Sequence, residues 1–272
     1  PAGQRIDRLG VVLDRGGRRN RGWGCRGHTL SLAKTDPGVR LNRLRAGDCL
    51  DMQETGGIAA SPWIERSQAA RWPKLTTDKK CEVAVIGGGI VGVSTAYQLA
   101  VAGCKVVLLE ARRIGSGVTG NSSAKLTALQ GGVYGKLVGK FGPDTARDYA
   151  ELNLSGMALI EEVARTHDIE CSFKRRTSFD FTESQEGIET LQREEQAARR
   201  AGLDARLSAE TDLPFPVTAA LSLEKQAQFD PVAWTRGVAA LLPEMGCAVY
   251  EDTRVISADN GLGCQIRTDG GA

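Results

Sequence analysis

The sequence contains 272 residues, of which 41% are hydrophobic and 25% are charged, and its formal net charge is +2. This composition is typical of a globular protein with a sizeable core, and it excludes disorder of the whole chain. The longest apolar run, Val83 to Val93, has eleven residues, whereas a membrane-spanning helix needs about 20, so no membrane span is predicted.

The first 51 residues differ from the rest of the chain. Residues 1–50 hold eleven Lys or Arg against four Asp, a net charge of +7, and they show no periodic apolar pattern. We expect residues 1–51 to be a disordered or non-native extension, with Met52, the first methionine, as the natural start. A basic arm for an anionic surface and a transit segment remain alternatives. No nucleic acid partner is predicted for the folded part.

A strand–turn–helix–strand unit is predicted between Glu82 and Glu110. Residues 82–86 form a short apolar run typical of a buried parallel strand, and residues 105–110 form a second one. Between them, apolar residues recur at helical spacing, and Gly103 follows in the position expected after a helix end. The unit favours a parallel α/β sheet.

The turn of this unit carries a G-x-G-x-x-G pattern, from Gly87 to Gly92. Gly87 permits a tight turn, Gly89 removes a side chain that would block a pyrophosphate, and Gly92 lets the helix pack closely. Glu110 ends the next strand, where its carboxylate can accept the hydroxyls of a ribose and would repel the 2′-phosphate of NADP. We therefore predict a dinucleotide site, with a purely structural glycine turn as the alternative.

The segment after Glu110 bears on the choice between FAD and NAD. Residues 115–123, G-S-G-V-T-G-N-S-S, form a small polar loop whose N–H groups can approach a second stretch of an extended cofactor. Such a loop favours FAD, because an NAD domain usually continues into further regular α/β units. A flexible linker remains the alternative for this loop.

Several elements are predicted beyond the loop. A long helix begins at Pro143 and keeps a 3.6-residue apolar period. A second, polar helix covers 186–201, a third is capped by Asp230 and runs to Gly246, and 248–250 and 254–257 are short strands. Residues 171–181 alternate as a half-buried antiparallel strand; its apolar face holds Cys171, Phe173, Phe179 and Phe181, and its other face holds Lys174, Arg176 and Asp180.

Three stretches resemble the FAD-dependent D-amino acid oxidase superfamily: residues 83–93, the L-L-E sequence ending at Glu110, and residues 115–125. Residues 228–234 and 253–256 resemble it as well. The nearest subgroup comprises oxidoreductases whose full-length forms often carry a C-terminal Rieske iron–sulfur domain. Family members need a further segment that closes the flavin pocket. Because this sequence lacks that segment and the Cys and His pairs of a Rieske centre, it is expected to be an N-terminal fragment.

The resemblance implies an α/β fold, with a Rossmann-like FAD/NAD(P)-binding domain and a partial α+β substrate domain on a mixed or antiparallel sheet. The predicted divisions are an FAD-binding segment over 52–170, a substrate-domain segment over 171–246 and return strands over 247–272. The resemblance also implies a set of cofactor-binding residues, for the pyrophosphate, the ribose, the flavin side and the adenine. They are Gly87, Gly89, Gly92, Glu110, Ala111, Arg112, Ser116, Thr119, Ser122, Ser123, Ala124, Lys125 and Val255.

The predicted function is that of an FAD-dependent oxidoreductase that transfers a hydride from an amine or amino acid to the flavin. An NAD-linked dehydrogenase and a non-catalytic dinucleotide-binding fragment are the alternatives. The electron acceptor, whether oxygen, a quinone or an iron–sulfur partner, is left open. Seven scattered cysteines without a C-x-x-C pair predict free thiols and a cytoplasmic location, and two histidines are too few for a histidine-rich metal site.

No catalytic residue is assigned, and four side chains keep two interpretations each. Lys125 either stabilises a reduced flavin or is a solvated surface residue. Arg175 and Arg176 either bind a substrate carboxylate or lie at an exposed strand edge. His167 is expected to end a helix rather than to act in catalysis.

Overall fold

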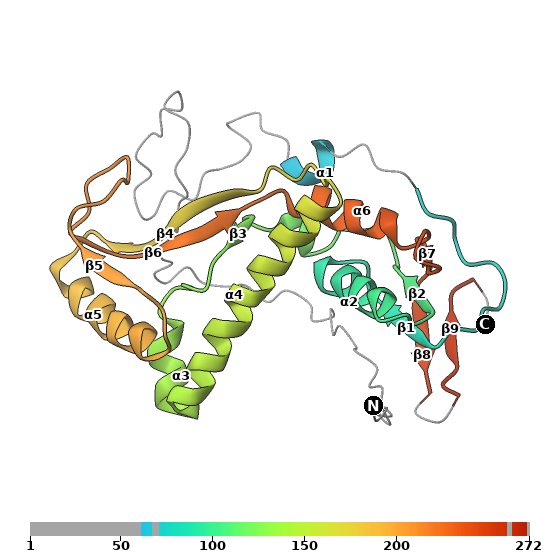
Figure 1. The fold of residues 1–272 in the computed structure, drawn as a ribbon, viewed down its shortest axis with the longest axis horizontal. Helices are drawn as coiled ribbons and strands as arrows, with labels where there is room; N and C mark the ends of the chain where they lie inside the picture. The colour runs from blue at the N-terminus through green and yellow to red at the C-terminus, as the bar shows by residue number, and fades with distance from the viewer. Residues whose placement is uncertain (1–60, 67–70, 260–262, 271–272) are drawn as a thin grey trace.

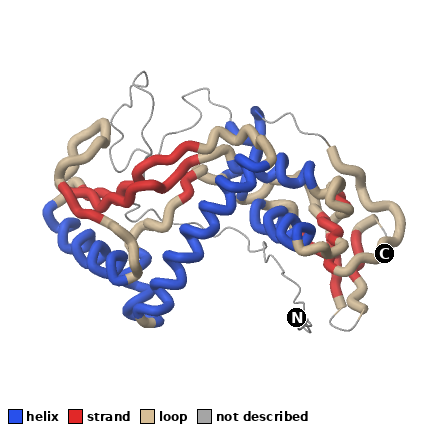
Figure 2. The backbone as a smooth tube through the Cα atoms, in the orientation of Figure 1, coloured by secondary structure: helices blue, strands red, loops and turns tan. Residues whose placement is uncertain are grey.

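The protein is described by a computed structural model over residues 61–66, 71–259 and 263–270. The predicted extension over 1–51 and Met52 lie outside the described residues. A parallel sheet and an antiparallel sheet lie at opposite ends of the described structure, and helix α4 (Pro143–Thr166) runs obliquely between them (Figure 1). Helices lie beneath the antiparallel sheet as well as between the two sheets (Figure 2). None of the helices in the described ranges is long and apolar enough to cross a membrane.

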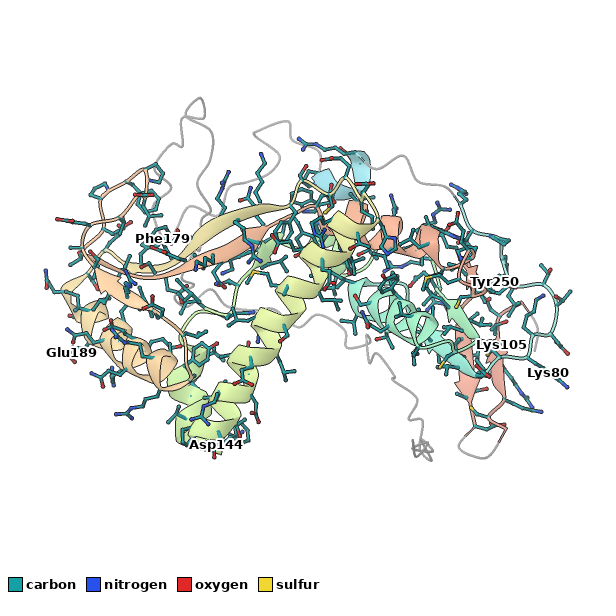
Figure 3. All side chains as sticks on the ribbon, in the orientation of Figure 1. Lys80, Lys105, Asp144, Phe179, Glu189 and Tyr250 are labelled. Atoms are coloured by element: carbon teal, nitrogen blue, oxygen red, sulfur yellow. The ribbon has the colours of Figure 1, made fainter. Side chains whose placement is uncertain are left out.

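The parallel sheet consists of β1 (Val83–Ile86), β2 (Val106–Leu109) and β7 (Ala248–Tyr250), in the order β1-β2-β7. Helix α2 (Ile90–Val101) connects β1 to β2, so the predicted strand–turn–helix–strand unit is confirmed. All four residues of β2 are buried because β2 is the central strand. Figure 3 labels Lys105, which precedes β2, and Tyr250, which ends β7, at opposite ends of this sheet.

Helix α6 (Pro231–Leu241) packs against α2. The Asp230 side chain caps it by accepting hydrogen bonds from two amides of the first turn, each at 2.9 Å, as the sequence predicts. The helix ends at Leu241, earlier than the predicted Gly246. The physical reason is Pro243, which has no N–H to continue the helical ladder.

The antiparallel sheet is built on β6 (Ala219–Gln228), a strand that the sequence analysis did not predict. Strand β4 (Lys174–Thr182) pairs along one edge of β6. On the other edge, β3 (Lys125–Leu126) pairs near one end and β5 (Arg206–Ser208) near the other. Beside the parallel sheet, β8 (Val255–Ala258) pairs with β9 (Ile266–Thr268) in a small two-stranded sheet.

Helix α4 contributes to both main cores, which is why it can connect the two sheets. Its N-terminal half supplies Ala146 and Ala150 to the core that includes Leu221 and Leu223 of β6. Its C-terminal half joins the core of the parallel sheet, where Trp234 Nε1 of α6 donates to the carbonyl oxygen of Ile160 at 3.0 Å. Two further helices pack on α4: α3 (Val133–Phe141), which was not predicted, and α5 (Gln185–Arg200), which was.

The predicted burial of the segment over 171–181 is wrong near its end, although Cys171 is buried and Lys174 is exposed as expected. The strand begins at Lys174, and Asp180 is 3% exposed, although it was expected on the exposed face. Phe179 and Phe181 are only half-buried. The reason is a specific hydrogen bond: Asp180 Oδ2 accepts from the amide of Gly131 at 2.9 Å, at the entrance to α3. A buried carboxylate is tolerated where such donors are supplied.

We expect Asp180→Asn to change the pH dependence of stability. Burial raises the pKa of Asp180 above its ordinary value of 3.8, although Lys125 and the Gly131 amide act in the opposite direction. The folded state therefore holds a proton on the Asp180 carboxylate more tightly than the unfolded chain does. As the pH falls through the pKa of the folded state, protonation of Asp180 increases the free energy of unfolding. At neutral pH the variant should be at least as stable as the native protein, because asparagine can still accept from Gly131.

Urea unfolding of both proteins, from neutral pH down to about pH 4, measures this difference. The stability of the native protein should rise relative to Asp180→Asn as the pH is lowered. Asp148→Asn, which removes an exposed carboxylate from α4, is the control and should show no such trend of comparable size. Parallel pH profiles for the native protein and Asp180→Asn would contradict the assignment.

Candidate functional site

The glycine turn between β1 and α2 is held in a conformation that only small residues permit. Gly87 has a φ of +106°, and its amide donates to the carbonyl oxygen of Leu109 at 2.8 Å, which ties the turn to β2. A Cβ atom on Gly92 would lie 1.9 Å from the carbonyl oxygen of Gly87, and one on Gly88 would lie 2.3 Å from Ile114 Cδ1. Backbone and side chains therefore exclude any larger residue at Gly88 and Gly92.

The N-terminus of α2 opens directly from this turn. Gly89 is the capping residue, and no side chain of its own satisfies the first amides of the helix. The hydroxyl oxygen of Thr119 accepts from the amide of Ile90 at 2.9 Å. A Cβ on Gly89 would meet only this hydroxyl, at 3.2 Å. Unpaired N–H groups and the helix dipole make such a terminus a site for a phosphate group.

Glu110 lies at the carboxyl end of β2, beside the glycine turn. Its carboxylate accepts from the amide of Gly88 at 2.6 Å and from the amide of Arg112 at 2.7 Å. Ala111 is half-buried between them, and the side chain of Arg112 is exposed. These contacts fix the Glu110 carboxylate beside the glycine turn, and its predicted role toward a ribose stays a prediction.

The polar loop over 115–123 folds back onto the glycine turn, so it is not a free linker. The amide of Gly115 donates to the carbonyl oxygen of Gly88 at 2.9 Å. The hydroxyl oxygen of Ser116 is buried and has no hydrogen-bond partner within the described part of the chain. Helix α1 (Pro62–Arg66) braces the loop, where Trp63 Nε1 donates to the carbonyl oxygen of Ser122 at 2.9 Å.

Residues 122–125 lead from this loop into the antiparallel sheet. The hydroxyl oxygen of Ser122 accepts from the amide of Ala124 at 3.1 Å, and Ala124 adopts a φ of +62°. Ser123 is exposed, and Lys125 begins β3 opposite Gln228. The structure thus places Ser122 to Lys125 at the junction of the two sheets rather than at the helix terminus itself.

Val255, predicted to meet the adenine, lies next to β2. The amide of Thr253 donates to the carbonyl oxygen of Glu110 at 2.9 Å, which brings the start of β8 alongside the end of β2. Val255 packs in a small apolar cluster with Val107 and Leu109. Segments more than 140 residues apart in the sequence therefore meet at Glu110.

Glu251 is a residue that the sequence analysis missed. It is completely buried, and its carboxylate accepts from the amides of Ile114 at 2.7 Å and of Trp72 at 3.3 Å. It also forms an ion pair with Arg113 at 2.9 Å. Arg236 Nε donates to the carbonyl oxygen of Ile114 at 3.1 Å, and burial, with the nearby charge of Arg113, lowers the pKa of Arg236. Together these groups anchor the segment that leads into the polar loop.

His167 lies at the C-terminus of α4, as predicted, and its Nε2 is 2.8 Å from the hydroxyl oxygen of Tyr97 on α2. The contact joins two helices of the core of the parallel sheet. It gives this histidine a packing role away from the glycine turn.

Comparisons with known proteins bear on the family and the fold of this chain. Residues 82–272 match the model of a family described as FAD dependent oxidoreductase (DAO). The protein YhfW of Bacillus subtilis (strain 168), whose name describes a Rieske 2Fe-2S iron-sulfur protein, is 29% identical over 199 residues. Gamma-glutamylputrescine oxidoreductase of Escherichia coli (strain K12) is 28% identical over 205 residues. Each match covers 73% of this chain, but only 39% and 48% of the respective relative.

Solved structures show the same fold. The structure of L-amino acid deaminase from Proteus myxofaciens in complex with anthranilate matches with a TM-score of 0.61 and 19% identity. The match covers 76% of this chain and 46% of that one. The predicted α/β class with a Rossmann-like unit is therefore confirmed, and the chain spans less than half the length of each of these three proteins.

Proposed function

Because this chain belongs to the family of FAD dependent oxidoreductases, we propose that it supplies the dinucleotide-binding part of an enzyme that oxidises an amine or an amino acid. One observation carries the proposal furthest. The glycine turn, the N-terminus of α2 and the folded-back loop over 115–123 meet at one place: the amide of Gly115 donates to Gly88, and Thr119 accepts from the amide of Ile90. The loop also holds the buried hydroxyl of Ser116, which has no partner among the described residues, and a helix N-terminus of this kind favours a phosphate group.

The described residues fit FAD in type and position. The turn from Gly87 to Gly92 and the N-terminus of α2 would hold the pyrophosphate, with the hydroxyls of Ser116 and Thr119 as further donors. The carboxylate of Glu110 would accept the ribose hydroxyls. Val255 would meet the adenine through its backbone. Ser122 to Lys125 would approach the flavin side, and Ala111 and Arg112 would lie beside the ribose with Glu110.

When bound, FAD supplies the acceptor for a hydride from the substrate carbon next to nitrogen. The residues of this chain position the cofactor and control the polarity around it. Glu251 pairs with Arg113 and accepts from the amide of Ile114, and these contacts hold the start of the loop over 115–123 beside the glycine turn. The catalytic acid–base groups are left unassigned.

Family membership favours FAD over the NAD-linked alternative, and the amine or amino acid substrate is supported by the names of the relatives. The name of YhfW supports an iron–sulfur centre as the electron acceptor, with a quinone or oxygen as the other options. A cytoplasmic location is part of the proposal; the five cysteines in the described ranges are free thiols, as expected of a reducing compartment.

The variant Gly89→Val tests the cofactor site. The valine methyl groups would enter the space in front of the α2 N-terminus, so we expect the purified protein to lose its bound flavin. The fold should persist, because the new Cβ meets only the Thr119 hydroxyl. Flavin per polypeptide is measured from the visible absorbance of the purified protein, and folding from circular dichroism.

Gly139→Val is the matched control, since Gly139 is an exposed residue of α3 with no atom within 4 Å of its would-be Cβ. It should retain flavin. Unchanged flavin content in Gly89→Val, or absence of flavin from the native protein, would count against the proposal.

A further inference from the structure

A cleft of about 590 Å³ lies between α4, β6 and the segment that follows α5. Its volume is within the range of about 300–1,000 Å³ that is usual for small-molecule sites. Helices α4 and α5 lie on one side of the antiparallel sheet (Figure 1), and the cleft lies on that side. None of its lining residues belongs to the predicted cofactor-binding set, so the proposed function leaves this cleft without a role.

The floor of the cleft is apolar. Met157 of α4, Leu203 and Leu223 line it and are each 5% exposed, and Leu154 of α4 is half-buried beside them. An apolar group placed on these side chains leaves water without losing a hydrogen bond, and an aromatic ring would also contact the methionine sulfur. The floor therefore fits a large apolar group, aromatic or branched.

The rim of the cleft includes an irregular part of β6. The register between β4 and β6 shifts between Arg176 and Ser178, and Glu224 and Lys225 are the β6 residues at this shift. Lys225 adopts a φ of +58°, a conformation that lysine rarely adopts. Bulges redirect side chains and are frequent beside functional sites, and a strained backbone is a reason to look for a function there.

Two of the four charged residues that line the cleft are matched within the fold. The guanidinium of Arg175 pairs with Glu161 of α4, with Nε 3.2 Å from Oε1, and its Nη1 donates to the carbonyl oxygen of Lys225 at 2.6 Å. Asp204 pairs with Arg206 at 2.7 Å. These contacts brace the walls of the cleft, and for Arg175 they favour a structural role over the binding of a substrate carboxylate.

Glu224 and Lys225 are the two charges without a close partner. Both are exposed, and neither forms an ion pair with any residue in the described part of the chain. The pKa of Asp204 is lowered chiefly by Arg206 and more weakly by Lys225, so the charge of Lys225 lies near the wall that Asp204 forms. One anion and one cation, adjacent in the chain, therefore stand at the rim of an apolar cleft.

We propose that this cleft binds a small zwitterion with a large apolar tail, a class whose simplest members are free amino acids such as phenylalanine and leucine. The ammonium group would pair with the carboxylate of Glu224, the carboxylate would pair with the ammonium of Lys225, and the side chain would lie on the apolar floor. A ligand with only one of the two charges leaves the other rim charge unmatched. The inference goes beyond the proposed function and does not rest on flavin binding.

A series of four ligands tests the inference. Phenylalanine carries all three features; phenethylamine lacks the carboxylate, 3-phenylpropanoate lacks the ammonium group, and alanine lacks the ring. Isothermal titration calorimetry should show that phenylalanine binds about tenfold more tightly, or better, than each of the other three. Thermal unfolding should shift upward with phenylalanine concentration, because a ligand that binds only the folded state stabilises it.

Variants of the rim locate the binding. Lys225→Asn and Glu224→Gln should each weaken phenylalanine binding about tenfold. Both positions are exposed, and asparagine tolerates a positive φ, so circular dichroism should show an unchanged fold. Lys136→Asn on α3 and Glu189→Gln on α5 are the matched controls, because both residues are exposed and outside the cleft; Figure 3 labels Glu189. The controls should bind phenylalanine as the native protein does.

Binding at the cleft is separated from substrate binding beside a flavin by repeating the titrations on Gly89→Val. Phenylalanine binding that persists without flavin and is weakened by Lys225→Asn supports the cleft. No binding of phenylalanine or leucine, binding that survives both rim variants, or binding lost together with the flavin would overturn it. Flavin content bears on the proposed function alone; if Gly89→Val keeps its flavin, the comparison of Lys225→Asn with Lys136→Asn still decides the cleft.

Discussion

Replacement of Gly92 by alanine is expected to lower the free energy of unfolding by about 3 kcal/mol, the upper range for inserting one carbon into a packed site. The new Cβ would lie 1.9 Å from the carbonyl oxygen of Gly87 and 3.0 Å from its carbonyl carbon. Both are backbone atoms of a turn that is fixed to β2 through Leu109, so neither can move without breaking the turn. Flavin binding should be lost with it.

Chemical denaturation measures the stability change, and the visible absorbance of the purified protein measures flavin. Gly156→Ala is the matched control, because Gly156 lies in the middle of α4 with no atom within 4 Å of its would-be Cβ. That change should stabilise the protein by about 0.5–1 kcal/mol through helix propensity. The two substitutions are chemically identical, so equal effects would show that the turn is not packed as described.

Replacement of Glu251 by glutamine is expected to cost about 3 kcal/mol, the lower range for breaking a buried ion pair by changing one partner. The carboxylate is fully buried and receives two amides and the guanidinium of Arg113. Glutamine keeps the shape but removes the charge, and with it the carboxylate that pairs with Arg113 among the described residues. We also expect weaker flavin binding, because the amide of Ile114 precedes the loop that folds onto the glycine turn.

Urea unfolding and titration with FAD measure the two effects. Glu244→Gln, which removes an exposed carboxylate after α6, should change stability by no more than about 0.5 kcal/mol. An effect of Glu251→Gln as small as that of the control would contradict the anchoring role. Loss of stability with unchanged flavin affinity would show that Glu251 supports the core without supporting the loop.

Local patterns predicted the dinucleotide unit well. The apolar runs of β1 and β2, the helical spacing of α2 and the glycines between them depend on residues within 29 positions of one another. The cap at Asp230 is local as well, since its carboxylate binds amides two and three residues away. In such segments the spacing of residues along the chain already fixes which backbone groups meet.

The predictions from the sequence failed where the interacting residues are far apart along the chain. Strand β6 lacks a clean alternation because Lys225, with a φ of +58°, interrupts its pairing with β4 near Arg176 and Ser178. Asp180 looked like a surface residue, since a carboxylate in an alternating strand usually faces water. Its partner, the Gly131 amide, is 49 residues away.

The sequence by itself determined the α/β class and the glycine turn with Glu110, because these follow from short-range spacing and from residues that only one backbone geometry accommodates, and its resemblance to known sequences indicated the family. Only the tertiary structure decided which charges are matched. Glu251 meets Ile114 across 137 residues, Glu161 neutralises Arg175 but not Arg176, and the register of three strands brings Lys125 to Lys174. The free energy of a buried charge depends on its neighbours in space, and sequence order does not specify those neighbours.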